Sequence, residues 1–120
     1  MRTDHINGLK ILFYPAEGAL LGSSADALDV IGATYGQEID VIAIPAVRFD
    51  RDFFRLRTGL AGEFIQKMQN YWLRLVIVGD VSQQVAASDA LRDFVFETNK
   101  VGRHLFVADE TDLAARLKPL

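Results

Sequence analysis

Four short runs of mostly apolar residues limit the folds open to this chain more than any other feature. They lie at residues 10–14, 41–44, 73–78 and 103–107, and the first three end at proline or glycine. Apolar runs without polar alternation are typical of strands covered on both faces. Helical spacing of the apolar residues between the runs predicts alternating strands and helices, and therefore a parallel sheet with right-handed crossovers.

The chain begins with a different signal, the pair Asn7-Gly8 between apolar neighbours. Asn-Gly accepts the positive φ angles that the two central positions of a tight hairpin turn require. The pair predicts an antiparallel hairpin between residues 3–6 and 10–14. The expected order of elements is β-β-α-β-α-β-α-β-α. This order describes one α/β domain over residues 1–120, with a mixed, mostly parallel sheet and an N-terminal β-hairpin.

Capping residues mark the helices that are expected between the runs. Residues 23–26 supply capping side chains ahead of an apolar face of Leu28, Ile31 and Tyr35, so a helix is expected there, closed by Gly36. Ser88 begins a later helix in the same way, and a closing helix follows the last run. Each helix connects two strands or follows the last one, as the α/β pattern requires.

The start of the second helix is open to two interpretations. Its apolar spacing begins at Phe53, but two glycines shortly after Thr58 weaken its early turns. A glycine inside a helix costs about 1 kcal/mol relative to alanine, so the helix starts either near Phe53 or near Thr58. The aromatic pair Tyr71-Trp72 follows this helix and is expected to cover the core.

Composition excludes several classes of protein. The absence of cysteine removes disulfides, thiolate nucleophiles, zinc fingers and iron–sulfur clusters. Thirteen basic and sixteen acidic side chains give a net charge of −3, which argues against broad nucleic-acid binding. No apolar run approaches the roughly 20 residues of a membrane span, and the first residues do not form a signal peptide. A cytoplasmic protein without nucleic-acid or membrane partners is therefore expected.

The most polar segment follows the second apolar run. Four arginines and two aspartates lie within residues 48–57, and Thr58-Gly59 comes next, near an expected helix start. Free backbone amides at a helix start favour anions, and Arg55 or Arg57 could hold such an anion with its guanidinium fork.

A structural interpretation of the same segment is equally open. The arginines can pair with Asp50, Asp52 and Glu63 on a solvated face, and Gly59 and Gly62 can allow a close approach of helix and sheet. The two glycines are not a phosphate loop, because no lysine follows them and no G-x-G-x-x-G motif is present.

Asp80 is the next candidate, since it follows Gly79 at the carboxyl end of the third run. Ligands gather at this edge of open parallel sheets, although Gly-Asp is equally common in turns and caps. Only two histidines are present, His5 and His104, and His104 is expected to lie half-exposed at the start of an edge strand. No metal, no cofactor and no catalytic residue is predicted from these side chains.

Several stretches together resemble a small bacterial domain-of-unknown-function family, number 4180. They are FFRLRTGLAGEFIQK at 53–67, NY at 70–71, LVIVGD at 75–80, SDALRDF at 88–94 and E-x-N-K at 97–100. The resemblance extends from the second strand to the last helix, and T-G-x-A-G-E is its most specific part. The family label implies no activity.

Element order and length are more distantly similar to the STAS fold of bacterial anti-sigma-factor antagonists. In that fold a strand–loop–helix junction carries an Asp-Ser-Ser-Gly-Leu motif, whose serine a partner kinase phosphorylates. Thr58-Gly59-Leu60 stands where Ser-Gly-Leu would, so the resemblance implies Thr58 as the phosphoacceptor. Arg57 replaces the preceding serine and Leu56 the aspartate, which weakens the match.

The leading hypothesis is a non-catalytic regulatory or protein-interaction module with a STAS-like α/β fold. It would recognise a protein partner through residues 55–63, a surface that includes Gly62 and Glu63. Phosphorylation of Thr58 would change the charge at a helix start and so reset partner affinity.

The alternative hypothesis is a small anionic-ligand binding protein or a weak enzyme. Arg55, Arg57, Thr58 and the backbone at Gly59 would hold the anion, while Asp80 faces the same crevice. A homodimer that pairs through an exposed strand or helix face is a third hypothesis.

Overall fold

The Asn7-Gly8 turn closes the expected hairpin. In the computed structural model, which describes residues 1–120, β1 (Arg2–Ile6) is antiparallel to β2 (Leu9–Phe13). The φ angles of Asn7 and Gly8 are 53° and 82°, the left-handed values that this type of turn needs. The predicted N-terminal hairpin is confirmed.

Three further strands extend the sheet in one direction. β3 (Val41–Pro45), β4 (Arg74–Val78) and β5 (Leu105–Val107) add in parallel to β2, and the sheet has the order β1-β2-β3-β4-β5. Because every parallel strand is added on the same side, right-handed crossovers place the connecting helices on one face. The predicted α/β domain with a mixed, mostly parallel sheet is confirmed.

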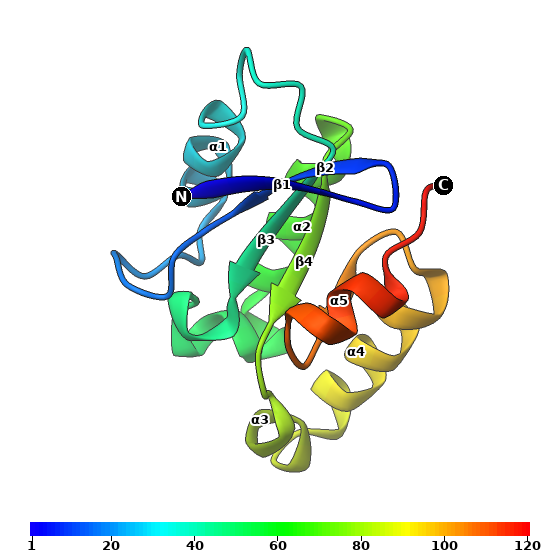
Figure 1. Cartoon of the computed structure of the whole chain (residues 1–120). Helices are drawn as coiled ribbons and strands as arrows, with labels where there is room; N and C mark the ends of the chain where they lie inside the picture. The colour runs from blue at the N-terminus through cyan, green and yellow to red at the C-terminus, as the bar shows by residue number, and fades with distance from the viewer.

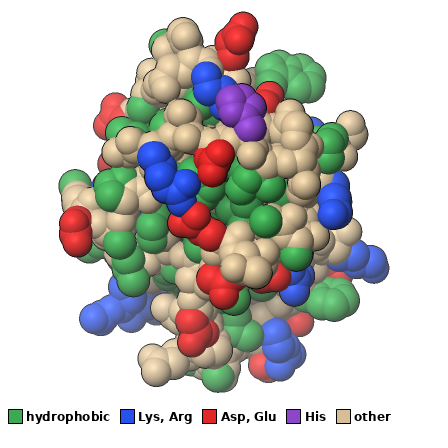
Figure 2. Space-filling model, viewed as in Figure 1, with side chains coloured by type: hydrophobic (Ala, Val, Ile, Leu, Met, Phe, Trp, Pro, Cys, Tyr) green, Lys and Arg blue, Asp and Glu red, His purple; other side chains and the backbone are tan.

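Helices cover the two faces of the sheet unequally. The first face carries α1 (Ser24–Gly32), α2 (Leu60–Asn70) and α4 (Asp89–Val101), whereas α5 (Glu110–Arg116) covers the second face. Figure 1 shows α2 behind the sheet and α5 on the viewer's side. Figure 2 shows acidic, basic and hydrophobic side chains intermixed on the face with α5. None of the helices has the length and apolar character that crossing a membrane requires.

The alternation of strand side chains divides the core into two clusters. A cluster of 20 buried residues lies under α1, α2 and α4, and a cluster of 9 lies under α5. The strand residues of the larger cluster are Leu12, Ile42, Ile44, Leu75, Ile77 and Phe106. Those of the smaller cluster are Ile11, Phe13, Val41, Ala43, Val76, Leu105 and Val107. Burial on both faces explains why these strands are apolar without alternation.

The first helix begins as expected, but its buried face matches the expected one only at Ile31. The Ser23 hydroxyl accepts the Asp26 N–H at 3.1 Å, and the Asp26 carboxylate accepts the Ser23 N–H, which makes a capping box. Of the three residues of the expected face, Ile31 is buried, whereas Leu28 and Tyr35 are exposed. The helix ends at Gly32, before the apolar period reaches Tyr35, and it packs through Ala27, Val30 and Ile31.

The second helix starts near Thr58, as one of the two interpretations of the sequence predicts, and not near Phe53. Three short 3₁₀ turns, η1 (Ala46–Arg48), η2 (Arg51–Phe54) and η3 (Leu56–Thr58), precede it, and α2 begins at Leu60. Gly59 separates η3 from α2 with a φ of 77°, a conformation that interrupts a right-handed helix.

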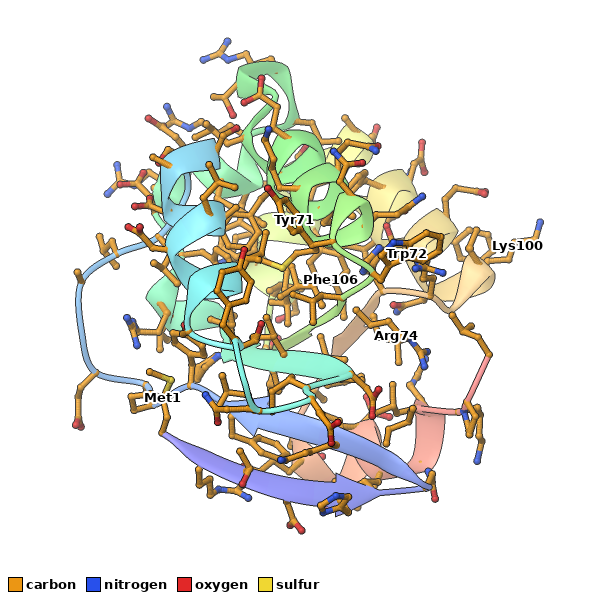
Figure 3. The ribbon with its side chains drawn as sticks, turned by 90° about the horizontal axis from the view of Figure 1, so that it is seen from above. Met1, Tyr71, Trp72, Arg74, Lys100 and Phe106 are labelled. Carbon is orange, nitrogen blue, oxygen red and sulfur yellow. The ribbon has the colours of Figure 1, made fainter.

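Two other expectations about this half of the sheet are corrected. A short helix that was not expected, α3 (Ser82–Ala86), lies between β4 and α4. Tyr71 and Trp72 do not cover the core, because the chain turns outward at Trp72 (φ 62°) and leaves this residue 82% exposed. Leu73 is buried in their place. Figure 3 labels Tyr71 and Trp72, the two residues that follow α2.

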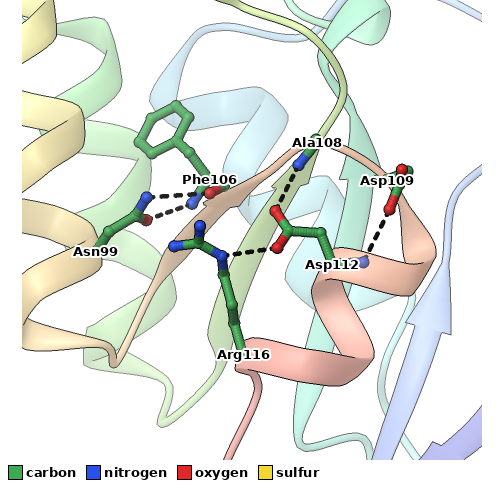
Figure 4. A network of polar contacts seen from close by, with 6 residues as sticks. All are labelled: Asn99, Phe106, Ala108, Asp109, Asp112 and Arg116. Carbon is green, nitrogen blue, oxygen red and sulfur yellow. Dashed lines mark hydrogen bonds and ion pairs between the residues drawn. The ribbon is translucent and has the colours of Figure 1, made fainter.

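Side chains join α4, β5 and α5 at the free edge of the sheet. The Asn99 amide donates to the Phe106 carbonyl at 3.1 Å and accepts the Phe106 N–H at 2.8 Å (Figure 4). The Asp112 carboxylate accepts the Ala108 N–H at 2.9 Å and the Arg116 Nε–H at 2.7 Å. Asn99 therefore occupies the hydrogen-bonding position that a sixth strand would take beside β5.

Candidate functional site

Three arginines of the polar segment line one cavity. Arg51, Arg55 and Arg57 come from η2, η3 and the residue between them, and they face a space of about 590 Å³. The opposite wall belongs to the connection between α3 and α4 and to the first turn of α4, where Ser88 is the capping residue. The cavity lies beyond the carboxyl ends of β3 and β4, the edge at which ligands bind in open α/β sheets.

Aromatic residues fix the loop that carries these arginines. Phe53 and Phe54 of η2 are buried, and their rings lie 5.3 Å apart. Phe53 also contacts Phe49 and Phe64, with ring centroids 4.2 and 5.7 Å away. Because this apolar side of the loop is anchored in the core, the arginines between the aromatic residues are directed outward.

The local pairing expected for the arginines holds for only one of the three. Arg55 lies 3.5 Å from the Asp52 carboxylate, and both side chains are about half-exposed. Arg51 and Arg57 form no ion pair. The cavity therefore carries an excess of positive charge, and none of its lining residues is acidic.

Thr58 acts within the loop and does not line the arginine cavity. Its hydroxyl oxygen lies 2.8 Å from the Asp52 carbonyl and 2.7 Å from the Arg55 carbonyl, and it accepts the Leu60 N–H at 3.3 Å. One hydroxyl proton serves the two carbonyls, so Thr58 joins η2, η3 and the start of α2. This side chain is a local cap of the kind that threonine commonly provides.

The remaining candidates lie in different surroundings. Gly59 is the N-cap of α2, whereas Gly62 lines a separate cavity between α2 and α4. Glu63 accepts a hydrogen bond from the Ser24 hydroxyl of α1 at 3.3 Å. The structure thus brings Arg55 and Arg57 together with Arg51, and it does not bring Gly62 or Glu63 to the same cavity.

Asp80 does not share the crevice with the arginines. It is exposed at the end of β4 and lines another cavity, beside Gly79, Val81 and Ala108. The Asp80 carboxylate accepts the Ser82 N–H at 2.8 Å, and hydrogen bonds from the side chain and backbone of Ser82 lower its pKa. This is the cap of a turn, the second of the two roles that the sequence left open.

Arg48 belongs to the same sequence segment but has a structural role that was not foreseen. It is 7% exposed, and its guanidinium donates to the carbonyls of Pro15, Glu17 and Ala19 at 2.9 to 3.1 Å. Gly18 has a φ of 139°, which favours glycine, and a Cβ there would lie 2.7 Å from the Arg48 Cζ and displace the guanidinium. The positive charge of Arg48 secures the loop after β2 and is not available to a ligand.

His104 and Arg74 form a second polar cluster that sequence reasoning missed. Arg74 is 5% exposed and donates to the carbonyls of Gly102, Arg103 and Lys118 at 2.7 to 2.9 Å. His104 is buried, contrary to the expectation of a half-exposed edge residue, because its Nδ1 accepts the Leu75 N–H at 3.0 Å. Burial, with the charges of Arg103 and Arg74, lowers the pKa of His104 to about 4.

The side chains offer no assembled metal centre, since no three His, Cys, Asp or Glu residues lie close enough together to hold an ion.

The fold and the site define a small α/β domain with an arginine-lined cavity at the carboxyl edge of its sheet. The chain belongs to the family described as Domain of unknown function (DUF4180), whose model matches residues 6–117. This match confirms the family resemblance seen in the sequence. No curated protein and no solved structure matches the chain. The likeness to the STAS fold stays a prediction.

Proposed function

We propose that this protein binds the phosphate or carboxylate group of a small ligand in the arginine cavity. The observation that carries the proposal is the convergence of Arg51, Arg55 and Arg57 on one cavity of about 590 Å³ at the start of α4. Guanidinium groups present two parallel N–H donors that match the oxygens of such anions. The volume lies within the usual range of small-molecule sites, roughly 300–1,000 Å³.

The charge distribution supports this choice of ligand. Two of the three guanidinium groups lack an ionic partner, so like charges face one cavity without neutralisation. A bound anion relieves their repulsion, and the backbone amides in the first turn of α4 add a favourable dipole. The alternative hypothesis of the sequence is therefore the better supported one, with Arg51 added to its residues and with Asp80 and Thr58 outside the cavity.

The residues that line the arginine cavity favour ligand binding without catalysis. The cavity wall contains no histidine, acidic residue, lysine or tyrosine, and its one hydroxyl, that of Ser88, accepts the Leu91 N–H as the cap of α4. A general acid or base with a pKa near neutrality is thus missing from the residues that would contact the ligand.

A thermal-shift screen with phosphate, pyrophosphate, nucleotides and dicarboxylates tests the proposal. A ligand present at a hundred times its dissociation constant stabilises the fold by about 2.7 kcal/mol. Arg57→Gln should weaken this stabilisation, whereas Lys100→Gln removes one positive charge at the opposite end of α4 and should leave it unchanged. If no anion raises the melting temperature, or if both variants respond like the wild type, the cavity is not an anion site.

A second function, a regulatory module switched at Thr58, is favoured by the position of its hydroxyl. The hydroxyl proton serves the carbonyls of Asp52 and Arg55, and phosphorylation removes that proton. A phosphothreonine would therefore loosen the junction of η2 and η3, place negative charge beside the arginines, and alter recognition of a protein partner. The predicted likeness to the STAS fold is the second support for this hypothesis, and a bacterial, cytoplasmic protein is part of the same proposal.

Intact mass measurement after incubation with cell lysate and ATP tests the switch. Wild type and Thr58→Ser should gain one phosphate, and Thr58→Ala should gain none. A pull-down comparison should then show different partner recovery for the phosphorylated and unmodified protein. Equal phosphorylation and equal recovery for wild type and Thr58→Ala would rule out the switch.

A further inference from the structure

A second cavity, of about 420 Å³, lies between α2 and α4 and is separate from the arginine cavity. Gly62 and Ile65 line it from α2, and Phe94 and Val101 line it from α4. A Cβ on Gly62 would meet no heavy atom within 4 Å, so the space beside this glycine is open. Arg103 and His104 lie in its wall, just before β5.

The hydrogen bonding of His104 determines which ring nitrogen carries the proton. Nδ1 accepts the Leu75 N–H, so the proton of the neutral ring is on Nε2. The ring is neutral at pH 7, because its pKa is about 4. His104 therefore presents one N–H donor, and this Nε2 is buried without a hydrogen-bond partner.

The neighbouring residue adds a second unused donor. Arg103 Nε is also buried without a partner, and these two nitrogens are the only side-chain polar atoms of the protein in that condition. Buried donors are nearly always paired in native proteins, since their loss of hydration is costly. Two unpaired donors on adjacent residues in one cavity wall indicate an acceptor that both can share.

We propose that this cavity binds a small carboxylic acid with an apolar body. Its two carboxylate oxygens accept the His104 Nε2–H and the Arg103 Nε–H, and its apolar body contacts Ile65, Phe94 and Val101. A monoanion suits the site better than a phosphate, because Arg103 is the only cation in the wall and Glu97 on the rim repels further negative charge.

A ligand reaches the two nitrogens only when part of the wall moves. Both atoms are covered in this structure, whereas the side chains of Gln66, Gln69 and Val101 on the rim are exposed. Exposed side chains change rotamer within picoseconds to nanoseconds, and such changes at the rim are the opening that the proposal includes.

Nuclear magnetic resonance of the histidine rings tests the proposal in the full chain. Phenylacetate and isovalerate are the ligands to add, with 2-phenylethanol and 3-methylbutanol as matched neutral controls. The acids should shift the His104 Nε2 resonance in a saturable way and leave His5, on β1, unchanged. The alcohols should produce no such shift. Absence of a saturable His104 shift at millimolar acid, or an equal shift with the alcohols, would overturn the proposal.

Two variants separate a direct contact from a structural role. His104→Asn keeps an oxygen that can accept the Leu75 N–H and removes the Nε2–H donor. Arg103→Lys keeps the charge and removes the Nε–H. Each should weaken acid binding by roughly tenfold or more, measured by ligand-observed resonance. Lys100→Gln, which removes a positive charge from α4 outside this cavity, should leave it unchanged. Unaltered affinity in both wall variants, with folding confirmed by circular dichroism, would place the acid elsewhere.

Discussion

Two arginines, Arg48 and Arg74, show how a charged side chain can hold a small domain together without an acidic partner. Each is buried and donates to three backbone carbonyls distant in sequence, which lie in one segment for Arg48 and in two segments for Arg74. Carbonyl groups that leave regular structure need donors when they are buried. The five N–H groups of one guanidinium meet that need for a whole loop, so these arginines are part of the fold and the exposed ones remain for binding.

His104 gives the protein a pH-dependent stability at the residue scale. Its pKa is 6.5 in an unfolded chain and about 4 in the fold, so between these values the unfolded state binds a proton that the folded state does not. The free energy of unfolding should therefore fall as the pH falls from 6.5 to 4, by about 3 kcal/mol in total. Below that pH range the titration of His104 lowers the free energy of unfolding no further.

Urea unfolding followed by circular dichroism at several pH values measures this effect. The variant His104→Asn has no titrating ring and should lose most of the slope between pH 6.5 and 4. The pKa values of Asp26 and Asp112 are also lowered in the fold. Their contributions to the free energy of unfolding are lost only at lower pH than that of His104, so the effect of His104 can be measured separately. An unchanged slope in the variant would show that another group titrates there.

At the scale of elements, the free edge of β5 is closed by one side chain. Asn99 forms two hydrogen bonds with the outward-facing backbone of Phe106. Asn99→Ala should lower the free energy of unfolding by about 1–3 kcal/mol. It should also leave the edge of β5 open, and an open edge favours pairing with a second chain. Light scattering at rising protein concentration should show more self-association for Asn99→Ala than for Asn70→Ala, an exposed asparagine on α2. Equal self-association of the two variants would mean that β5, with its three residues, is too short to pair with a strand of a second chain.

Local signals in the sequence predicted the elements well. The capping box at Ser23 and the Asn7-Gly8 turn involve neighbours within a few residues, so they can be recognised without knowledge of the fold. The 3₁₀ turns before α2 were not predicted, because they depend on Phe53 reaching Phe49 and Phe64 in the core. Contacts of that kind depend on how the elements pack, which spacing along the chain does not reveal.

The candidate site was predicted only in part for the same reason. Arg55 and Arg57 stood out by their density of charge, and both line the cavity. The opposite wall around Ser88 comes from 30 residues further along the chain, and Asp80 is directed to another cavity by the turn after β4. Burial of His104 arises from a hydrogen bond to the neighbouring strand, which no local pattern signals.

At the scale of the whole molecule, the two cores differ in size and in how they are covered. The smaller core depends on α5, in which Leu113 is completely buried, and on Leu117 just after it. Leu113→Ala should lower the free energy of unfolding by about 2–5 kcal/mol. Leu120→Ala, at a residue 77% exposed, should change it by less than about 0.5 kcal/mol. Denaturant unfolding by circular dichroism compares the two, and similar losses would show that α5 does not hold this core.

The outward position of Trp72 has a practical consequence for studies in solution. It is the only tryptophan of the chain, and 82% of its surface is already in contact with water when the protein is folded. Its fluorescence emission should therefore change little when the protein denatures, so it is a poor reporter of unfolding. The same property makes it a sensitive reporter of contact, because a molecule that covers the end of α2 would move this indole out of water and shift its emission to shorter wavelength.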